Sequence, residues 1–190
     1  MQDPIVDTWT REAPITGEIG RTLRELNLRF LDLDGIAAPG LVALPPARKA
    51  SIADCPYALF DLRFEEDAYW RTRLDIAMPH WVAERGAADG EVAAFVRLAL
   101  IYAWHLATSA TLQARLLLGM SARTAATFAD ATVVRLTQIA EAEAPNLAPR
   151  WPRCTAFWDG LADAAGTADR VRLRRIQLYG LQLAVAKRLR

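Results

Sequence analysis

The stretch LLLGMSARTAATFADATVVRLTQIAE, residues Leu116 to Glu141, decides the fold. Gly119 is the residue type that most readily ends a helix, because glycine adopts the left-handed backbone conformation without strain. Ser121 and Thr132 each precede an amphipathic run, and both are residue types favoured at the first cap of a helix. The stretch therefore predicts a helix, a tight turn and two capped helices. This layout is that of a compact helical module and not of a catalytic pocket.

Helical patterns continue on both sides of this stretch. From Glu91 onward, Phe95, Leu98, Ile101, Tyr102 and Leu106 recur at spacings typical of a helix. Further helices are predicted from Thr16 to about Leu33, over FEEDAYWRTRL (residues 64–74), and from about Ala168 to Leu189. Proline-rich connectors are predicted over residues 35–50 and 145–152, with Ser51 capping a short turn and Pro56 opening the following helix. Apolar and polar residues nowhere alternate with period two. We predict an all-α, multi-helix globular bundle with a central helix-turn-helix-like module.

Composition sets the outer limits. The chain has 190 residues, of which 53% are hydrophobic and 24% charged, as in a globular protein with a sizeable core. No apolar run reaches the ~18 residues of a membrane span, and MQDPIVDTWTREAP at the N-terminus lacks a secretory pattern. Cys55 and Cys154 have no paired spacing. We predict a cytoplasmic protein with a helical extension of unknown role over residues 1–90 and a regulatory and dimerisation domain over residues 91–190.

The net charge of +1 conceals an asymmetry. Residues 1–90 contain 10 Lys and Arg against 15 Asp and Glu, whereas residues 91–190 contain 13 against 7. The basic excess lies after Asp169, at Arg170, Arg172, Arg174, Arg175, Lys187, Arg188 and Arg190. Clustered cations supply the sequence-independent part of nucleic-acid binding, but they also suit a solvated helix face near a C-terminus.

One motif points to an enzyme. FLDLDG, residues 30–35, resembles the first motif of haloacid-dehalogenase-type phosphatases, in which Asp32 would be the nucleophile and Asp34 a general acid near magnesium. Ile36 stands where that family usually has Thr, and no late acidic metal motif follows. The alternative is a helix that ends at Gly35 with two solvated acids.

Other catalytic patterns have even less support in the sequence. His80 and His105 pair with neither cysteine at a metal-ligand spacing, and the phosphate-binding and nucleophile-elbow motifs are missing. We therefore predict no enzyme, no cofactor, no metal and no small-molecule substrate.

A DNA-binding helix-turn-helix would use residues 112–118 as its first helix, Gly119 and Met120 as its turn, and residues 121–130 as its recognition helix. Two features weaken this interpretation. Arg115 stands where a small residue is usual, and Arg123 is the one strong base or phosphate donor in the recognition helix.

From about residue 97 to 183 the chain resembles the bacterial flagellar regulator FlhD. The matching residues are mostly small or apolar: Ala103, Leu106, Ala114, Leu118, Gly119, Ala125, Thr132, Ile139, Ala140, Glu141, Arg150, Trp151, Leu173, Ile176 and Gly180. FlhD-like proteins are all-α dimers that activate transcription together with a DNA-binding partner, FlhC.

The resemblance implies a non-enzymatic transcriptional regulator subunit that forms a homodimer, docks an FlhC-type partner and contacts DNA through the complex. The candidate dimer residues are Leu98, Ile101, Tyr102, Leu106, Leu117 and Phe128. The candidate nucleic-acid contacts are Arg123, Arg135, Arg172, Arg174, Arg175, Lys187 and Arg188. The alternative is a helical adaptor or assembly factor, for example of a secretion or flagellar apparatus, that binds protein only.

Overall fold

The computed structural model describes residues 17–36, 39–75 and 90–186, and 75% of these residues are helical. The helices are α1 (Glu18–Asp32), α2 (Pro39–Val42), α3 (Pro46–Ala53), α4 (Asp67–Asp75), α5 (Gly90–Ser109), α6 (Thr111–Leu118), α7 (Ala122–Asp130), α8 (Val133–Glu143), α9 (Thr155–Gly166) and α10 (Arg170–Ala186). A 3-10 turn, Ala144–Asn146, follows α8, and two-residue strands β1 (Phe60–Asp61) and β2 (Ala148–Pro149) pair antiparallel. The predicted all-α bundle is confirmed.

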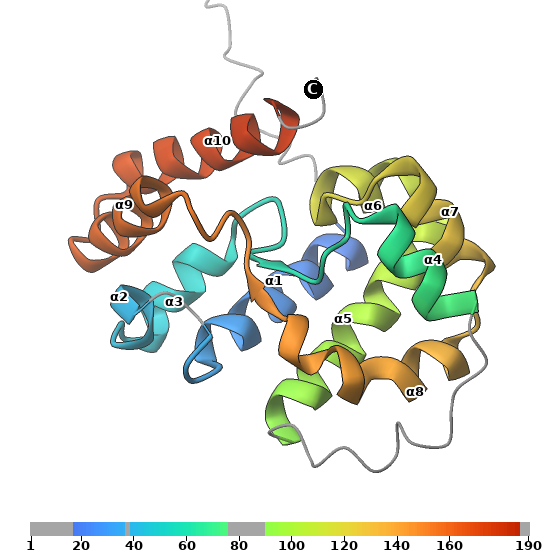
Figure 1. Ribbon diagram of the computed structural model, residues 1–190. Coiled ribbons are helices and arrows are strands. Elements are labelled where there is room, and N and C mark those ends of the chain that lie inside the picture. The colour runs from blue at the N-terminus through green and yellow to red at the C-terminus, as the bar shows by residue number, and fades with distance from the viewer. Residues whose placement is uncertain (1–16, 37–38, 76–89, 187–190) are drawn as a thin grey trace, which may run out of the picture.

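Helix α5 is the centre of one half of the molecule. It packs against α1, α6, α7 and α8, and α4 covers α7 from outside (Figure 1). Helix α5 is long and apolar enough to cross a membrane, but half of its apolar window is buried inside the protein. Its position among four other helices accounts for that composition, because a helix surrounded by protein is apolar on most of its faces.

The predicted turn around Gly119 is present. Gly119 ends α6 in the left-handed conformation, with φ 78°. The side chain of Ser121 accepts a hydrogen bond from the Thr124 amide at 2.9 Å, and that of Thr132 accepts one from the Arg135 amide at 3.2 Å. These two bonds satisfy amides that the first turns of α7 and α8 would otherwise leave without partners.

The other half of the molecule contains α2, α3 and the pair α9–α10 (Figure 1). The segment predicted as a connector, residues 35–50, contains α2 and the start of α3. Pro46 occupies the first turn of α3, where the missing amide of proline costs nothing. Two further expectations are wrong, since Ser51 lies inside α3 and Pro56 lies outside any helix. Helix α9 was not predicted.

A buried arginine joins the halves beside the β1–β2 pair. The guanidinium of Arg150 donates to the Leu117 carbonyl, at the end of α6, over 2.7 Å. The Arg150 amide donates to the Leu59 carbonyl over 2.8 Å, and its guanidinium lies 4.7 Å from the Trp151 ring centroid. Arg150 thereby ties the end of α6 to the segment that directly precedes β1.

The described residues before and after position 90 share one hydrophobic core. The Phe95 ring on α5 lies 6.1 Å from that of Phe30 on α1 and 5.1 Å from that of Phe60 on β1. Trp70 on α4 contacts Phe128 on α7, with ring centroids 4.7 Å apart. Apolar side chains of the described part of residues 1–90 are therefore buried against α5 and α7.

Candidate protein-interaction surface

Helix α10 is held to the rest of the protein by one face. Gly180 lies over Tyr57 and Phe157, and a Cβ atom at this position would meet the Tyr57 hydroxyl oxygen at 2.0 Å. That hydroxyl donates to the Gln177 carbonyl over 3.0 Å. A glycine is required here because the helix backbone approaches an aromatic ring so closely.

The opposite face of α10 carries an apolar stripe. Its members are exposed and follow each other at spacings of seven, three and four residues: Val171, Leu178, Leu181 and Val185. Side chains at these spacings lie on one side of a helix. Leu178 retains 53% of its accessible surface and Val171 retains 72%. Apolar residues aligned in this way are a recognised form of helix-mediated binding surface.

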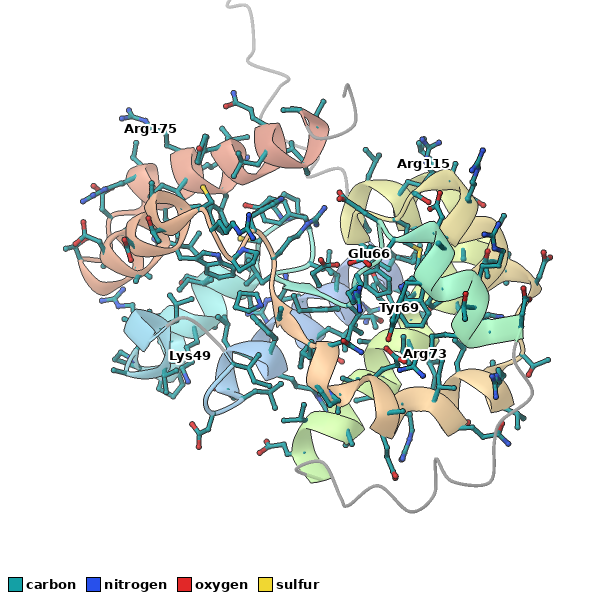
Figure 2. All side chains as sticks on the ribbon, viewed as in Figure 1. Lys49, Glu66, Tyr69, Arg73, Arg115 and Arg175 are labelled. Atoms are coloured by element: carbon teal, nitrogen blue, oxygen red, sulfur yellow. The ribbon has the colours of Figure 1, made fainter. Side chains whose placement is uncertain are left out.

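Arginines flank and interrupt this stripe. Arg174 and Arg175 are exposed on α10 and have no ion-pair partner among the described residues. Arg175 lies on the outer side of the helix (Figure 2). Arg172 pairs with Asp163 on α9, and α10 contains no acidic residue. We call the four apolar residues, together with Arg174 and Arg175, the α10 face; it is both apolar and positively charged.

The structure distributes the other predicted DNA contacts over separate elements. Arg123 is exposed on α7. Arg135 donates from its guanidinium to the Arg73 carbonyl at the end of α4, over 2.8 Å, so it holds α4 against α8. Lys187 and Arg188 lie outside the described residues. Of the predicted contacts within the described residues, Arg172, Arg174 and Arg175 share one helix.

The first turn of α7, which would approach DNA in a helix-turn-helix, is covered by an acidic side chain. Asp67, the first residue of α4, accepts hydrogen bonds from the hydroxyls of Ser121 and, over 3.0 Å, Thr124. These bonds lower the pKa of the Asp67 carboxyl, with the Ser121 bond as the larger cause. A carboxylate at this position repels phosphate and occupies the side chains that would read base edges.

Most of the predicted dimer residues lie inside the molecule. Tyr102, Leu106, Leu117 and Phe128 are buried in the core of the chain itself, so they are not available to a second copy in this conformation. The helical spacing that suggested an interface is equally the spacing of a core-facing stripe. Leu98 is exposed and Ile101 is partly exposed, and these two lie on the surface of α5.

A buried polar junction joins α4 to the end of α8, and sequence reasoning missed it. Glu143 is fully buried and accepts a hydrogen bond from the Tyr69 hydroxyl over 2.5 Å and one from the Asn146 amide over 2.9 Å. Arg73 Nε lies 3.0 Å from Glu143 Oε1 as an ion pair that is not aligned as a hydrogen bond. Burial and the bond to Glu143 raise the pKa of Tyr69. Figure 2 shows Tyr69 and Arg73 between α4 and α8.

This polar junction acts as a structural clamp. The carboxylate of Glu143 is surrounded by donors from two other elements, which is how a buried charge is tolerated in a protein. Tyr69 donates its proton to that carboxylate, and Arg63 stacks on the Tyr69 ring with its guanidinium carbon 4.1 Å from the centroid. These contacts hold α4 in place against the end of α8.

The two aspartates of the phosphatase-like motif do not form a site. Asp32 ends α1, a helix, where the phosphatase motif requires the end of a strand, and its carboxylate lies 2.8 Å from Lys49 Nζ. Asp34 is exposed in the turn before Gly35, which adopts φ 74°. In the described ranges no group of three or more His, Cys, Asp or Glu side chains is placed to hold a metal ion.

Comparisons with models of known protein families, with curated proteins and with solved structures returned no match for this chain. The resemblance to FlhD accordingly stays a prediction from the sequence.

Proposed function

We propose that this protein is a non-enzymatic helical adaptor that binds another protein through the α10 face. The observation that carries the proposal is the exposed apolar stripe of Leu178, Leu181 and Val185 on a helix whose opposite side is fixed to the core. Soluble proteins rarely leave large side chains aligned in water without a binding role. A helix that is anchored before binding also loses little conformational entropy when a partner docks.

The chemistry of the α10 face supports an acidic amphipathic helix as the partner. Leucine and valine side chains at helical spacing fit between the side chains of a second apolar helix. Arg174 and Arg175 would form charge-assisted hydrogen bonds with Glu or Asp beside the apolar residues of that helix. Tyrosine and arginine are residue types that protein interfaces favour, and Tyr179 is also exposed on α10.

A regulator subunit of the FlhD type is the second candidate. It is favoured by the exposed arginines of α10, which would contact phosphates without reading sequence. The α7 turn gives this candidate less support, because Asp67 covers the end of α7, the helix that would enter the major groove of DNA.

The experiment that tests the proposal measures binding of fluorescent probes to the purified chain by anisotropy. The probes are a designed helical peptide with leucines on one face and glutamates beside them, the same peptide with lysines instead, a DNA duplex, and anionic lipid vesicles. We expect the acidic peptide to bind and the lysine peptide to bind far more weakly.

Two substitutions connect that binding to α10. Leu178→Asp and Arg174→Glu are each expected to weaken binding of the acidic peptide at least tenfold. Val134→Asp is the matched control, because Val134 is 65% exposed on α8, outside the α10 face. Tighter binding of DNA or of vesicles than of the acidic peptide, lost in the same variants, would overturn the adaptor proposal in favour of those ligands.

A further inference from the structure

A groove between α1 and α5 presents the chemistry that the α10 face requires. The groove has a volume of about 290 Å³, and its apolar lining consists of Ile19, Leu26, Leu98, Ile101 and Tyr102. Leu26 and Tyr102 are buried and form its floor, and the Tyr102 hydroxyl donates to the Ile19 carbonyl over 3.0 Å. This bond fixes the two helices against each other, so the groove is preformed. Its volume is near the lower end of known ligand pockets, about 300 Å³.

The α1 side of the groove carries two carboxylates. Glu18 and Glu25 line it seven residues apart, which places them on one side of α1 about 10 Å from each other. Neither glutamate forms an ion pair with another residue of the described ranges. Arg29 and His105 also line the groove. Among the described residues, its carboxylates are therefore Glu18 and Glu25, and Arg29 partly offsets their charge.

We infer that the partner of the α10 face is a second copy of this chain, with α10 of one molecule seated in the α1–α5 groove of another. Leu178, Leu181 and Val185 would enter the groove as side chains of successive turns, and Arg174 would reach a rim carboxylate. Both surfaces are apolar at the centre, one is flanked by arginines without acids, and the other has glutamates at its rim. The inference rests on the docking role proposed for α10.

The same complementarity argues against two α10 faces binding each other. Each α10 carries four arginines and no acidic residue within Arg170–Ala186, and like charges brought together in an interface are unfavourable. Pairing of α10 with the groove removes that repulsion. Because Gly180 and Gln177 hold the inner side of α10 against Tyr57, its apolar stripe faces outward to a different molecule.

The contact joins two different surfaces of the chain. Two copies can exchange it reciprocally and close a dimer, or it can repeat from copy to copy and build a larger assembly. In both cases one defective α10 face or one defective groove interrupts the contact. This property makes the inference testable with mixtures of variants.

The first measurement is the mass of the purified full chain by light scattering over a range of concentrations. We expect the mass to rise from 21.0 kDa to at least twice that value. The association should weaken at high salt, because part of it is electrostatic and exposed charges are screened. A chain that stays at 21.0 kDa at all concentrations overturns the inference.

The decisive measurement mixes two variants. Leu178→Asp damages the α10 face and Leu98→Asp damages the groove, where Leu98 is 40% exposed. Each variant alone should be monomeric, whereas an equimolar mixture should form dimers through the one intact α10 face and the one intact groove. Val134→Asp should associate as the unchanged chain does, and circular dichroism checks that every variant is folded.

The outcomes separate this inference from the proposed function. If Leu98→Asp associates normally, or if the mixture stays monomeric, the second copy does not use the groove and the inference is overturned. If the acidic peptide still binds to α10 in that case, the adaptor function stands with a different protein as partner. Absence of both self-association and peptide binding overturns both.

Discussion

The polar junction at α4 and the α10 face differ in whether their charged and apolar groups are buried among partners within the molecule. At the junction, Glu143 is fully buried, and Tyr69, Asn146 and Arg73 surround its carboxylate. On the α10 face, Leu178 and its neighbours are exposed and Arg174 lacks an ion-pair partner among the described residues. The charged and polar groups of the junction contact partners within the molecule, whereas the residues of the α10 face are left exposed.

This difference separates structural residues from binding residues. A group whose partners are all internal contributes to stability, and its replacement is felt in the unfolding free energy. An exposed apolar or charged group contributes little to stability, so its replacement is felt when a partner binds. Stability measurements on matched variants can therefore test the assignment of each region.

The largest effect is expected in the aromatic core beside the junction. Phe128 is fully buried, 4.7 Å from the Trp70 ring centroid and 5.9 Å from that of Phe64. Phe128→Ala should lower the unfolding free energy by about 3–5 kcal/mol, as large cavities in cores do, measured by urea denaturation. A variant that keeps its stability but loses self-association would instead place Phe128 at an interface.

The next effect is expected at the junction itself. Glu143→Ala leaves the Tyr69 hydroxyl without its acceptor and removes one of the two acceptors of the Asn146 amide, so it should cost about 1–3 kcal/mol. It should also lower the pKa of Tyr69, since the bond to Glu143 is one cause of its raised value; spectroscopic titration of tyrosinate measures this. Glu141→Ala is the control, because Glu141 lies on the same helix, exposed, 3.9 Å from Arg97, and should change stability by less than about 0.5 kcal/mol.

Much of the helical pattern could be predicted from local sequence. Gly119, Ser121 and Thr132 act within a few residues of their own positions, so their effect on chain direction is visible in the sequence. Helix α9 was missed because it follows two prolines and its cap, Cys154, makes no side-chain hydrogen bond to the first turn. Arg150 was missed as a structural residue because its partners on α6 and directly before β1 are far away in the sequence.

The candidate surface could be predicted only in part. Arg174 and Arg175 stand out as a cluster of charge in the sequence, and the structure places both on the α10 face. The stripe of Leu178, Leu181 and Val185 was not predicted, because α10 has apolar residues on two opposite sides. Helical spacing alone does not tell which of these sides meets the core.

A smaller, pH-dependent effect is expected where α4 meets α7. The pKa of Asp67 is lowered in the folded state, so its ionised form stabilises the protein above the unfolded pKa, and this contribution is lost as the pH falls through the folded value. Asp67→Asn should therefore be less stable than the unchanged chain at neutral pH, and the difference should shrink below about pH 4. Thermal unfolding at several pH values measures this, and a difference in stability that stays the same at every pH would contradict the prediction.

The smallest effect on stability is expected on the α10 face. It tests most directly whether the exposed residues of α10 contribute to binding and not to stability. Leu173 and Leu178 lie five residues apart on α10, but Leu173 is 8% exposed and Leu178 is 53% exposed. Leu173→Ala should cost about 2–5 kcal/mol, whereas Leu178→Ala, measured on the monomer at low concentration, should change the unfolding free energy by less than about 0.5 kcal/mol. Equal losses at the two positions would mean that the outer side of α10 is covered within the single molecule, and a helix covered in this way has no face to offer to a partner.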